Sequence, residues 1–366
     1  MIQAEEKYMK RAIELAQLGA GSVSPNPMVG AVIVHRGKII GEGYHQKYGE
    51  PHAEVNAINS VLFKYPLAEE ILRESEIYVT LEPCAHHGKT PPCADLIIRY
   101  GIPHVITGSP DPFSLVNGKG IEKLREAGIY VTENILRREC DMMNRRFLTR
   151  IWEHRPYIIL KWARTADHFF APAGGAQKWI TSPTSRMLVH RWRSEEDAVL
   201  VGKNTALTDN PGLNVRDWTG RNPKRIVIDR HLELPADLYL FDQSQETMVF
   251  NSQKTETHGT VKYLWLEDFD HYLPQMLTYQ LYLMDIQSVI IEGGAKVLDL
   301  FIKAGLWDEA RIFTSQQHWG EGIKSPEIRG LSADRTDSGP DTLEILINPK
   351  SKLMTELFSA AETTSI

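Results

Sequence analysis

Pro51-His-Ala-Glu54 is the stretch that decides the fold of the first half of the chain. A proline just ahead of good helix formers predicts a helix that begins here, so His52 and Glu54 are expected in its first turn. A predicted strand over Ser75 to Leu81 then runs into Leu81-Glu-Pro-Cys-Ala-His-His-Gly-Lys-Thr-Pro-Pro-Cys93, whose prolines start a second helix in the same way. The two helix starts can converge over one sheet.

The sequence on either side of this stretch predicts a sheet sandwiched between helices. Two β-branched apolar runs around a short turn predict a hairpin, the N-terminus mixes charged and apolar residues as an amphipathic helix does, and strands alternate with helices downstream. The ranges are 28–34 and 38–44 for the hairpin, 1–19 for the helix, and 104–107 and 128–131 for the later strands.

A second unit is expected after a proline-containing interruption, Trp152-Glu-His-Arg-Pro156. Short apolar strands alternate with helical stretches downstream, which predicts a mostly parallel α/β sheet. The strands are expected at 157–161, 198–201, 225–228, 248–250, 288–291, 310–313 and 342–347. The chain is therefore expected to have two domains, residues 1–150 and residues 155–366.

Length and composition exclude several classes of protein. The 366 residues, 42% hydrophobic and 24% charged, are typical of ordinary globular domains, and the longest apolar runs are too short to cross a bilayer. Three cysteines without a signal peptide favour a reducing, cytoplasmic compartment over a disulfide framework. A formal net charge of −6 favours a small substrate over nucleic acid, whereas the composition leaves a homo-oligomer open.

His52, Cys84 and Cys93 make a candidate zinc site. Zinc prefers tetrahedral nitrogen and sulfur ligands, and a catalytic zinc keeps three protein ligands and one open position. Helix starts favour thiolate over thiol, and zinc lowers the pKa of water to near neutral. Glu54 is then placed to carry a proton from water to a ring nitrogen and on to departing ammonia. Iron or another metal in this site is the alternative.

Each part of this pattern also has a simpler explanation. A His-x-Glu occurs by chance and buried cysteines are more often inert, but the ordered combination favours a hydrolytic deaminase. Residues 85–92 separate the two cysteines, in place of the compact Pro-Cys-x-x-Cys of many nucleobase deaminases, and they carry His86, His87 and Lys89. These cationic donors suit a phosphate on the substrate, although a solvated surface loop has the same composition.

The N-terminal motifs resemble those of the bifunctional riboflavin-biosynthesis deaminase-reductases. The resemblance is carried by Pro25-Asn-Pro-Met-Val-Gly-Ala-Val32, by Gly43-Tyr-His45 and by the two stretches quoted at the start. It implies a cytidine-deaminase-like three-layer α/β sandwich, with zinc on the three ligands and Glu54 as the catalytic residue. The residues expected to contact the phosphoribosyl part of the substrate are Asn26, His45, His86 and Lys89.

The same family carries a C-terminal reductase similar to dihydrofolate reductase, which implies a second α/β sheet and NADPH as cofactor. The matching segments are Lys161-Trp-Ala163, Trp179-Ile-Thr-Ser182, Asp197-Ala-Val-Leu-Val-Gly202 and Glu292-Gly-Gly294. By the resemblance, NADPH would be lined by Ala163, Trp179, Thr205, Asp209 and the segment from Gly294 onward. The substrate would be held by Arg193, Leu213, Arg216 and Glu292.

Elementary chemistry agrees with parts of this assignment. The glycines after Glu292 let backbone N–H groups approach a phosphate at a helix start, and the guanidinium forks of Arg193 and Arg216 suit phosphate oxygens. A plain strand-to-helix turn and, for Arg193, a solvated helix face are the alternatives. No Gly-x-Gly-x-x-Gly follows a strand, so the NAD-type Rossmann fingerprint is absent.

One segment departs from the family pattern. The family usually has Leu-Asp-Gly and a basic residue after the first reductase strand, whereas this chain has Ala166-Asp-His-Phe169. A side chain in place of the turn glycine must find an allowed backbone conformation or change the path of the loop.

The expected function is two successive reactions. Zinc-dependent hydrolytic deamination of a diaminopyrimidinone ribosyl phosphate would be followed by NADPH-dependent reduction of the ribosyl side chain to ribityl. One alternative is a deaminase alone, whose C-terminal half is a degenerate reductase or a binding module. A second alternative is a non-catalytic protein with structural zinc. Structural zinc usually has four protein ligands, and the three found here argue against it.

Overall fold

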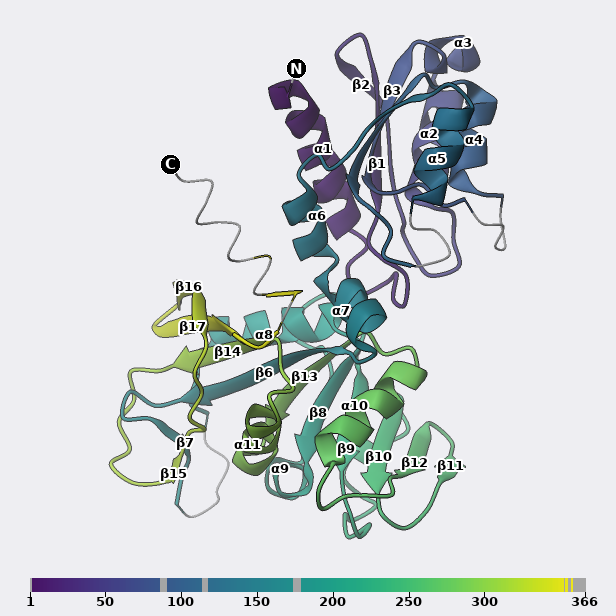
Figure 1. The fold of residues 1–366 in the computed structure, drawn as a ribbon. Helices are drawn as coiled ribbons and strands as arrows, with labels where there is room; N and C mark the ends of the chain where they lie inside the picture. The colour runs from purple at the N-terminus through teal and green to yellow at the C-terminus, as the bar shows by residue number, and fades with distance from the viewer. Residues whose placement is uncertain are drawn as a thin grey trace. The chain divides into compact units, whose positions relative to one another are not determined.

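The predicted N-terminal hairpin is present as β1 (Gly30–His35) and β2 (Lys38–Tyr44), which pair antiparallel. Arg36 and Gly37 form its turn with φ angles of 48° and 76°, the left-handed pair that suits a two-residue hairpin. β1 also pairs with β3 (Ser75–Leu81), and β3 continues through parallel pairing to β4 (His104–Ser109) and β5 (Tyr130–Thr132). The result is a sheet in the order β2-β1-β3-β4-β5 (Figure 1).

The computed structural model describes residues 2–85, 91–113, 118–173, 179–351, 353, 354 and 357. The chain divides into two units, Met1–Trp152 and Glu153–Ile366. His86 and Lys89, which are expected to contact the substrate, lie outside the described residues.

Helices cover both faces of the N-terminal sheet because the side chains of β1 alternate between two apolar clusters. Ala31 and Ile33 pack with α2 (Ala53–Lys64), α3 (Ala68–Leu72), α4 (Cys93–Tyr100) and α5 (Lys119–Glu126). Val32 and Val34 pack with α1 (Ile2–Gln17) and α6 (Arg137–Met143). The predicted three-layer sandwich is therefore confirmed.

The second unit is built on a larger sheet, ten-stranded in its described part, in the order β11-β12-β10-β9-β8-β13-β6-β14-β17-β16. Its central pairs, from β12 to β14, are parallel, and the outermost pairs are antiparallel, which agrees with the mostly parallel sheet that was expected. The bounds are β6 Tyr157–Arg164, β8 Ala198–Gly202, β9 Lys224–Ile228, β10 Thr247–Asn251, β11 Glu256–His258, β12 Val261–Trp265, β13 Ser288–Gly293, β14 Glu309–Thr314, β16 Leu331–Ser338 and β17 Asp341–Ile347.

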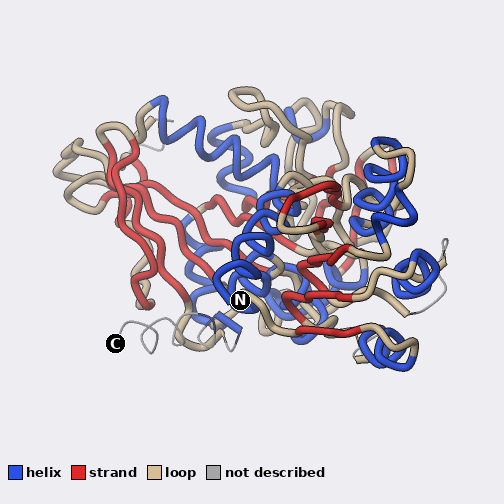
Figure 2. The backbone as a smooth tube through the Cα atoms, turned by 90° about the horizontal axis from the view of Figure 1, so that it is seen from above, coloured by secondary structure: helices blue, strands red, loops and turns tan. Residues whose placement is uncertain are grey.

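Both faces of this sheet are also covered by helices (Figures 1 and 2). On one face, α10 (Leu273–Leu283) and α11 (Ala295–Ala304) bury leucine and phenylalanine side chains against the strands. On the other, α8 (Pro183–Glu195) packs Trp192 on Phe313 of β14, with ring centroids 5.5 Å apart. A short helix, α9 (Lys203–Asp209), follows β8 directly, and β7 (Phe169–Ala171) pairs with β15 (Ile323–Lys324) in a separate two-stranded ribbon.

Several elements were not predicted from the sequence, among them the short strands β7, β11, β12 and β15. The first unit ends in two consecutive helices, α6 and α7 (Arg145–Glu153), which meet at Asn144. Strand β16 was missed because its side chains are almost all exposed, so neither an apolar run nor an alternating pattern marks it.

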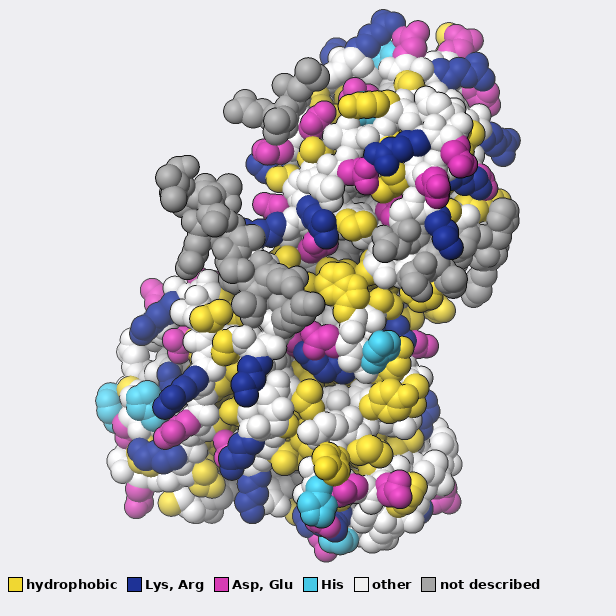
Figure 3. Space-filling model, viewed as in Figure 1, with side chains coloured by type: hydrophobic (Ala, Val, Ile, Leu, Met, Phe, Trp, Pro, Cys, Tyr) yellow, Lys and Arg dark blue, Asp and Glu magenta, His cyan; other side chains and the backbone are white. Residues whose placement is uncertain are grey.

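The outer surface of each unit mixes charges of both signs. Figure 3 shows Lys and Arg side chains interspersed with Asp and Glu side chains over the visible face. Among the described helices, none is both long enough and apolar enough to span a bilayer.

Candidate active sites

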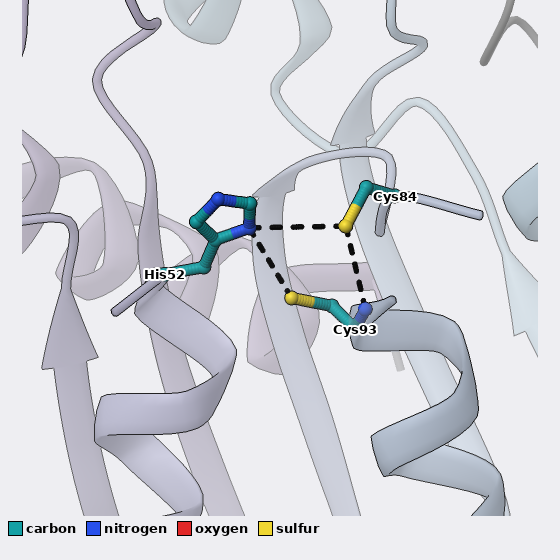
Figure 4. A group of neighbouring side chains, drawn as sticks. All are labelled: His52, Cys84 and Cys93. Atoms are coloured by element: carbon teal, nitrogen blue, oxygen red, sulfur yellow. Dashed lines mark hydrogen bonds between the residues drawn. The ribbon is translucent and has the colours of Figure 1, made fainter. Parts of the chain in front are cut away.

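Three side chains converge where α2 and α4 begin beside the end of β3 (Figure 4). His52 is the residue that caps the start of α2, Cys93 is the first residue of α4, and Cys84 lies just after β3. Their ligand atoms all lie within 4.8 Å of one another. His52 Nδ1 is 3.4 Å from Cys93 Sγ and 3.8 Å from Cys84 Sγ.

This geometry fits a tetrahedral metal. Zinc bonds of about 2.0–2.3 Å place a nitrogen and a sulfur ligand roughly 3.5–3.6 Å apart, close to the observed separations. The backbone N–H of Cys93 donates to Cys84 Sγ at 3.3 Å. A hydrogen bond from the Cys93 thiol, with a further one from His52, lowers the pKa of Cys84 to about 4. The hydrogen bond to Cys84 and burial raise the pKa of Cys93. Cys84 is therefore the cysteine of the two that loses its proton first as the pH rises.

Glu54 stands beside these ligands in the first turn of α2, with only 3% of its surface exposed. Burial raises the pKa of Glu54 to about 7, and the negative charge of Cys84 adds to that effect. A carboxyl group with such a pKa both accepts and donates a proton near neutral pH.

A cavity of about 340 Å³ opens over the cluster and is lined by His52, Glu54 and Cys84. Asn26 and His45, both expected to contact the substrate, line the same cavity. Asn26 Nδ2 lies 3.1 Å from His45 Nε2, and His45 Nδ1 lies 3.2 Å from the carbonyl oxygen of Pro51. Burial lowers the pKa of His45, so the neutral ring donates from Nδ1 to Pro51 and accepts at Nε2 from Asn26.

Sequence reasoning missed several residues of this cavity. Glu82 was quoted only as part of a motif, although it lines the cavity beside Cys84. The others come from the segment after β4 and from α7, where no local pattern marks them: Asp111, Phe113, Phe147, Arg150 and Ile151. Cavity walls built by distant segments have no signature in a short window of sequence.

In the second unit, Glu292 at the end of β13 accepts two hydrogen bonds from Arg193 of α8. The distances are 2.7 Å from Nε and 2.8 Å from Nη2, and Lys161 Nζ lies 3.6 Å from the same carboxylate. Burial favours a higher pKa for Glu292, but the charges of Arg193 and Lys161 outweigh it and lower the pKa to about 2. The guanidinium group of Arg193 was expected to suit the phosphate oxygens of the substrate. In the described part of the chain it binds the carboxylate of Glu292.

The loop after α9 brings the other expected substrate residues to this ion pair. Arg193 Nη1 donates to the carbonyl oxygen of Asn214 at 3.2 Å, which lies next but one to Arg216. Arg216 is exposed and donates from Nη1 to the side chain of Asn214 at 3.3 Å. Leu213 is buried, with a φ of 48°.

Most of the expected NADPH residues lie at the carboxyl ends of neighbouring parallel strands. Ala163 is near the end of β6, Thr205 and Asp209 are in α9 after β8, and Gly294 caps the start of α11 after β13. A Cβ on Gly294 would stand 3.0 Å from Thr205 Oγ1, and no side chain caps α11, so its first N–H groups are open to a phosphate. This cradle fits a dinucleotide phosphate.

Trp179 is placed differently from the other expected NADPH residues. It is 56% exposed and lies in the segment before α8, where the guanidinium of Arg186 stands 4.9 Å from its ring centroid.

The turn that departs from the family pattern keeps a regular path. His168 takes the left-handed conformation, with a φ of 65°, in the place of the usual glycine. The turn is closed by a hydrogen bond from His168 N to Thr165 O at 2.9 Å, and Asp167 accepts the backbone N–H groups of Trp319 and Gly320 at 3.0 Å and 2.8 Å. The side chain is therefore accommodated by an allowed backbone conformation.

Both halves of the chain match known families. Residues 2–109 match the cytidine and deoxycytidylate deaminase zinc-binding region, and residues 156–325 match the RibD C-terminal domain. The riboflavin biosynthesis protein RibD of Aquifex aeolicus is 42% identical over 333 residues, covering 89% of this chain and 91% of that protein. The Escherichia coli protein of the same name is 37% identical over 344 residues, covering 89% and 90%.

Solved structures give the same result. A diaminohydroxyphosphoribosylaminopyrimidine deaminase/5-amino-6-(5-phosphoribosylamino)uracil reductase from Thermotoga maritima is 38% identical, with a TM-score of 0.87, covering 95% of this chain and 99% of that chain. RibD of Acinetobacter baumannii is 32% identical, with a TM-score of 0.86, covering 96% and 100%. The similarity therefore extends over both units, and the predicted fold class is confirmed.

Proposed function

Because the chain belongs to the family of bifunctional riboflavin-biosynthesis deaminase-reductases, we propose a role for each of the site residues described above. The chain is a zinc-dependent deaminase and an NADPH-dependent reductase of riboflavin biosynthesis. Its first reaction removes the pyrimidine amino group of a diaminopyrimidinone ribosyl phosphate as ammonia. Its second reduces the ribosyl side chain to ribityl. The deaminase domain is residues 1–150 and the reductase domain is residues 155–366.

Zinc would be held by His52, Cys84 and Cys93, whose spacing fits a tetrahedral ion. When bound, zinc supplies the positive charge that lowers the pKa of water and readies it for attack. Glu54 as carboxylate takes a proton from the attacking water. As an acid, Glu54 then gives that proton to the ring nitrogen. Glu54 next takes the second proton, from the hydroxyl group added to the ring carbon, and gives it to the amino group; the C=O bond forms, the C–N bond breaks and ammonia leaves.

Asn26 and His45 orient the substrate from the same cavity, where the His45 ring lies 5.6 Å from that of His52 between centroids. Their mutual hydrogen bond and the one from His45 to Pro51 hold both side chains in place before the substrate arrives. A preorganised polar pair contributes to catalysis by fixing the reacting carbon near Glu54. His86 and Lys89 are proposed to hold the phosphoribosyl group, as the resemblance implies.

In the reductase, NADPH supplies a hydride to the open-chain sugar carbon. The segment from Gly294, with Thr205, Asp209, Ala163 and Trp179, would hold the cofactor. Arg216 and Leu213 would contact the substrate, and the buried pair of Arg193 and Glu292 would present its carboxylate to the substrate hydroxyls. The exposed guanidinium of Arg216 is the better phosphate partner, because that of Arg193 is engaged.

We place the protein in the cytoplasm because Cys84, Cys93 and Cys140 are all free thiols, and zinc-binding thiols persist in a reducing compartment. Cell fractionation with an antibody against the chain tests this location. Recovery in an oxidising compartment would contradict it.

The observation that carries the deaminase is the cluster of three ligands with the buried Glu54 in one cavity. The decisive experiment supplies the purified chain with diaminopyrimidinone ribosyl phosphate and records ammonia release and NADPH oxidation together. Both signals are expected. Ammonia without NADPH oxidation would refute the reductase roles, and absence of both from a zinc-loaded chain would refute the whole assignment.

A further inference from the structure

Glu82 makes an unusual set of contacts for a carboxylate that has no assigned part in the reaction. It follows β3 directly, lies two residues before Cys84, and is 3% exposed. Its Oε2 accepts the backbone N–H groups of Asp111 at 3.3 Å and Gly118 at 3.0 Å. Its Oε1 accepts those of Gly120 at 2.9 Å and Ile121 at 3.4 Å.

These four bonds tie the segment after β4 and the first turn of α5 to the stretch that carries a metal ligand. The contact is close, because a Cβ added to Gly120 would lie 1.9 Å from the carbonyl oxygen of Pro83. On its other side the same stretch is held by α4, where Ala94 N donates to Cys84 O at 3.2 Å. Glu82 therefore connects the segment after β4 and the start of α5 to the stretch that carries the metal ligand Cys84. The same stretch is held by α4 from its other side.

The tied segment forms part of the cavity wall. Asp111 and Phe113 line the cavity together with Glu54 and Cys84. Phe113 N donates to Asp111 Oδ1 at 2.9 Å, so the two residues form one turn. The position of this turn relative to the metal ligands is set through the Glu82 carboxylate.

We propose that Glu82 is a positioning residue of the deaminase, which holds the Asp111–Phe113 turn at the distance from the metal ligands that the pyrimidine substrate requires. This inference rests on the proposed deaminase function. Glu82 touches neither the reacting atoms nor the metal in this role. Glu82 acts on substrate binding, because it raises the fraction of molecules in which the Asp111–Phe113 turn is correctly placed.

Glu82→Gln tests the role with little change of shape. The amide keeps one acceptor oxygen and turns an NH₂ group toward two buried N–H donors, so two of the four bonds are lost. If the turn is then in place about a tenth of the time, the apparent KM for the pyrimidine rises about tenfold. The kcat at saturation, the zinc content and the visible absorption bands of the cobalt-substituted chain should stay as in the wild type.

The controls use the same chain. Glu74→Gln removes an exposed carboxylate of the same unit, paired with Arg36, and should leave KM unchanged. Circular dichroism of each variant, compared with that of the wild type, reports whether the first unit is folded.

Three results would overturn the proposal. An unchanged KM removes the positioning role, and altered cobalt bands or lost zinc would mean that Glu82 acts on the metal ligands instead. If Glu82→Gln does not fold, the Phe113→Ala variant is measured in its place, because it leaves every hydrogen bond to Glu82 intact. A wild-type KM of Phe113→Ala would show that the turn has no role in substrate binding. Absence of ammonia release from the wild type is a separate result that refutes the proposed function itself.

Discussion

Replacing Glu292 with glutamine should destabilise the second unit strongly, because it removes the negative partner of two buried cations. The side chain is 8% exposed and that of Arg193 is 11% exposed, so neither charge is well solvated. Glutamine keeps the size of the side chain and loses the charge. Removing one partner of a buried ion pair typically costs about 3–5 kcal/mol.

The pKa of Glu292 leads to a similar magnitude independently. Its ordinary value is 4.5, and the charges of Arg193 and Lys161 lower it to about 2 in the folded protein against the opposing effect of burial. A pKa about 2.5 below the ordinary value corresponds to about 3 kcal/mol of stability at neutral pH. We therefore expect Glu292→Gln to lower the free energy of unfolding by about 3 kcal/mol at pH 7.

The sign of the pH dependence follows from the direction of the shift. A carboxyl group whose pKa is lowered by folding stabilises the protein fully above its unfolded pKa, here 4.5. That stability is lost as the pH falls from 4.5 toward 2. Glutamine does not ionise, so the difference between wild type and variant should be constant from pH 8 to about pH 5 and shrink below it.

Urea unfolding followed by tryptophan fluorescence is the appropriate assay. Seven of the eight tryptophans lie in residues 153–366, so the signal reports the second unit. Glu256→Gln, which removes an exposed carboxylate paired with Lys254, is the matched control and should leave the free energy of unfolding nearly unchanged. A Glu292→Gln effect below about 1 kcal/mol at pH 7, or one that persists undiminished at pH 3, would refute the reasoning.

Three further predictions concern the first unit. Glu54→Gln should keep zinc, measured by metal analysis, and lose ammonia release at least a hundredfold, roughly the contribution of general acid–base catalysis; full activity would exclude the proton-carrying role. Removing zinc with a chelator should abolish ammonia release and spare NADPH oxidation on the deaminated intermediate, because all three ligands lie within Met1–Trp152; equal loss of both activities would contradict this. Asn144→Ala should lower the free energy of unfolding by about 2 kcal/mol and raise the deaminase KM, because the buried amide donates to Met28 O at 2.9 Å and accepts from Met28 N at 2.8 Å. An unchanged free energy of unfolding in chemical denaturation would show that these two hydrogen bonds are dispensable.

The metal cluster was predictable because each ligand sits in a local context that has its own signature. A proline at a helix start places His52 and Cys93, and the end of a buried strand places Cys84, so residue type and spacing define the site within short windows. The same is true of the N-terminal hairpin, whose turn and alternating strands are local features.

The pairing of Arg193 with Glu292 could not be predicted in the same way. The two residues are 99 positions apart, and each alone suggested contact with the substrate. An arginine fork binds a carboxylate as well as a phosphate, so only the folded chain, which brings Arg193 of α8 to Glu292, decides which partner it meets.

Sequence alone determined the chemistry of this protein: the ligand types, the carboxylate beside them, the two-unit order and the family to which the motifs belong. Tertiary structure alone decided which groups those residues meet, from the four backbone donors on Glu82 to the walls that α7 and the segment after β4 add to the cavity. The physical reason is range. Helix starts, turns and strand alternation depend on neighbours a few residues away, whereas burial and hydrogen bonding of a side chain depend on segments that only the folded chain brings together.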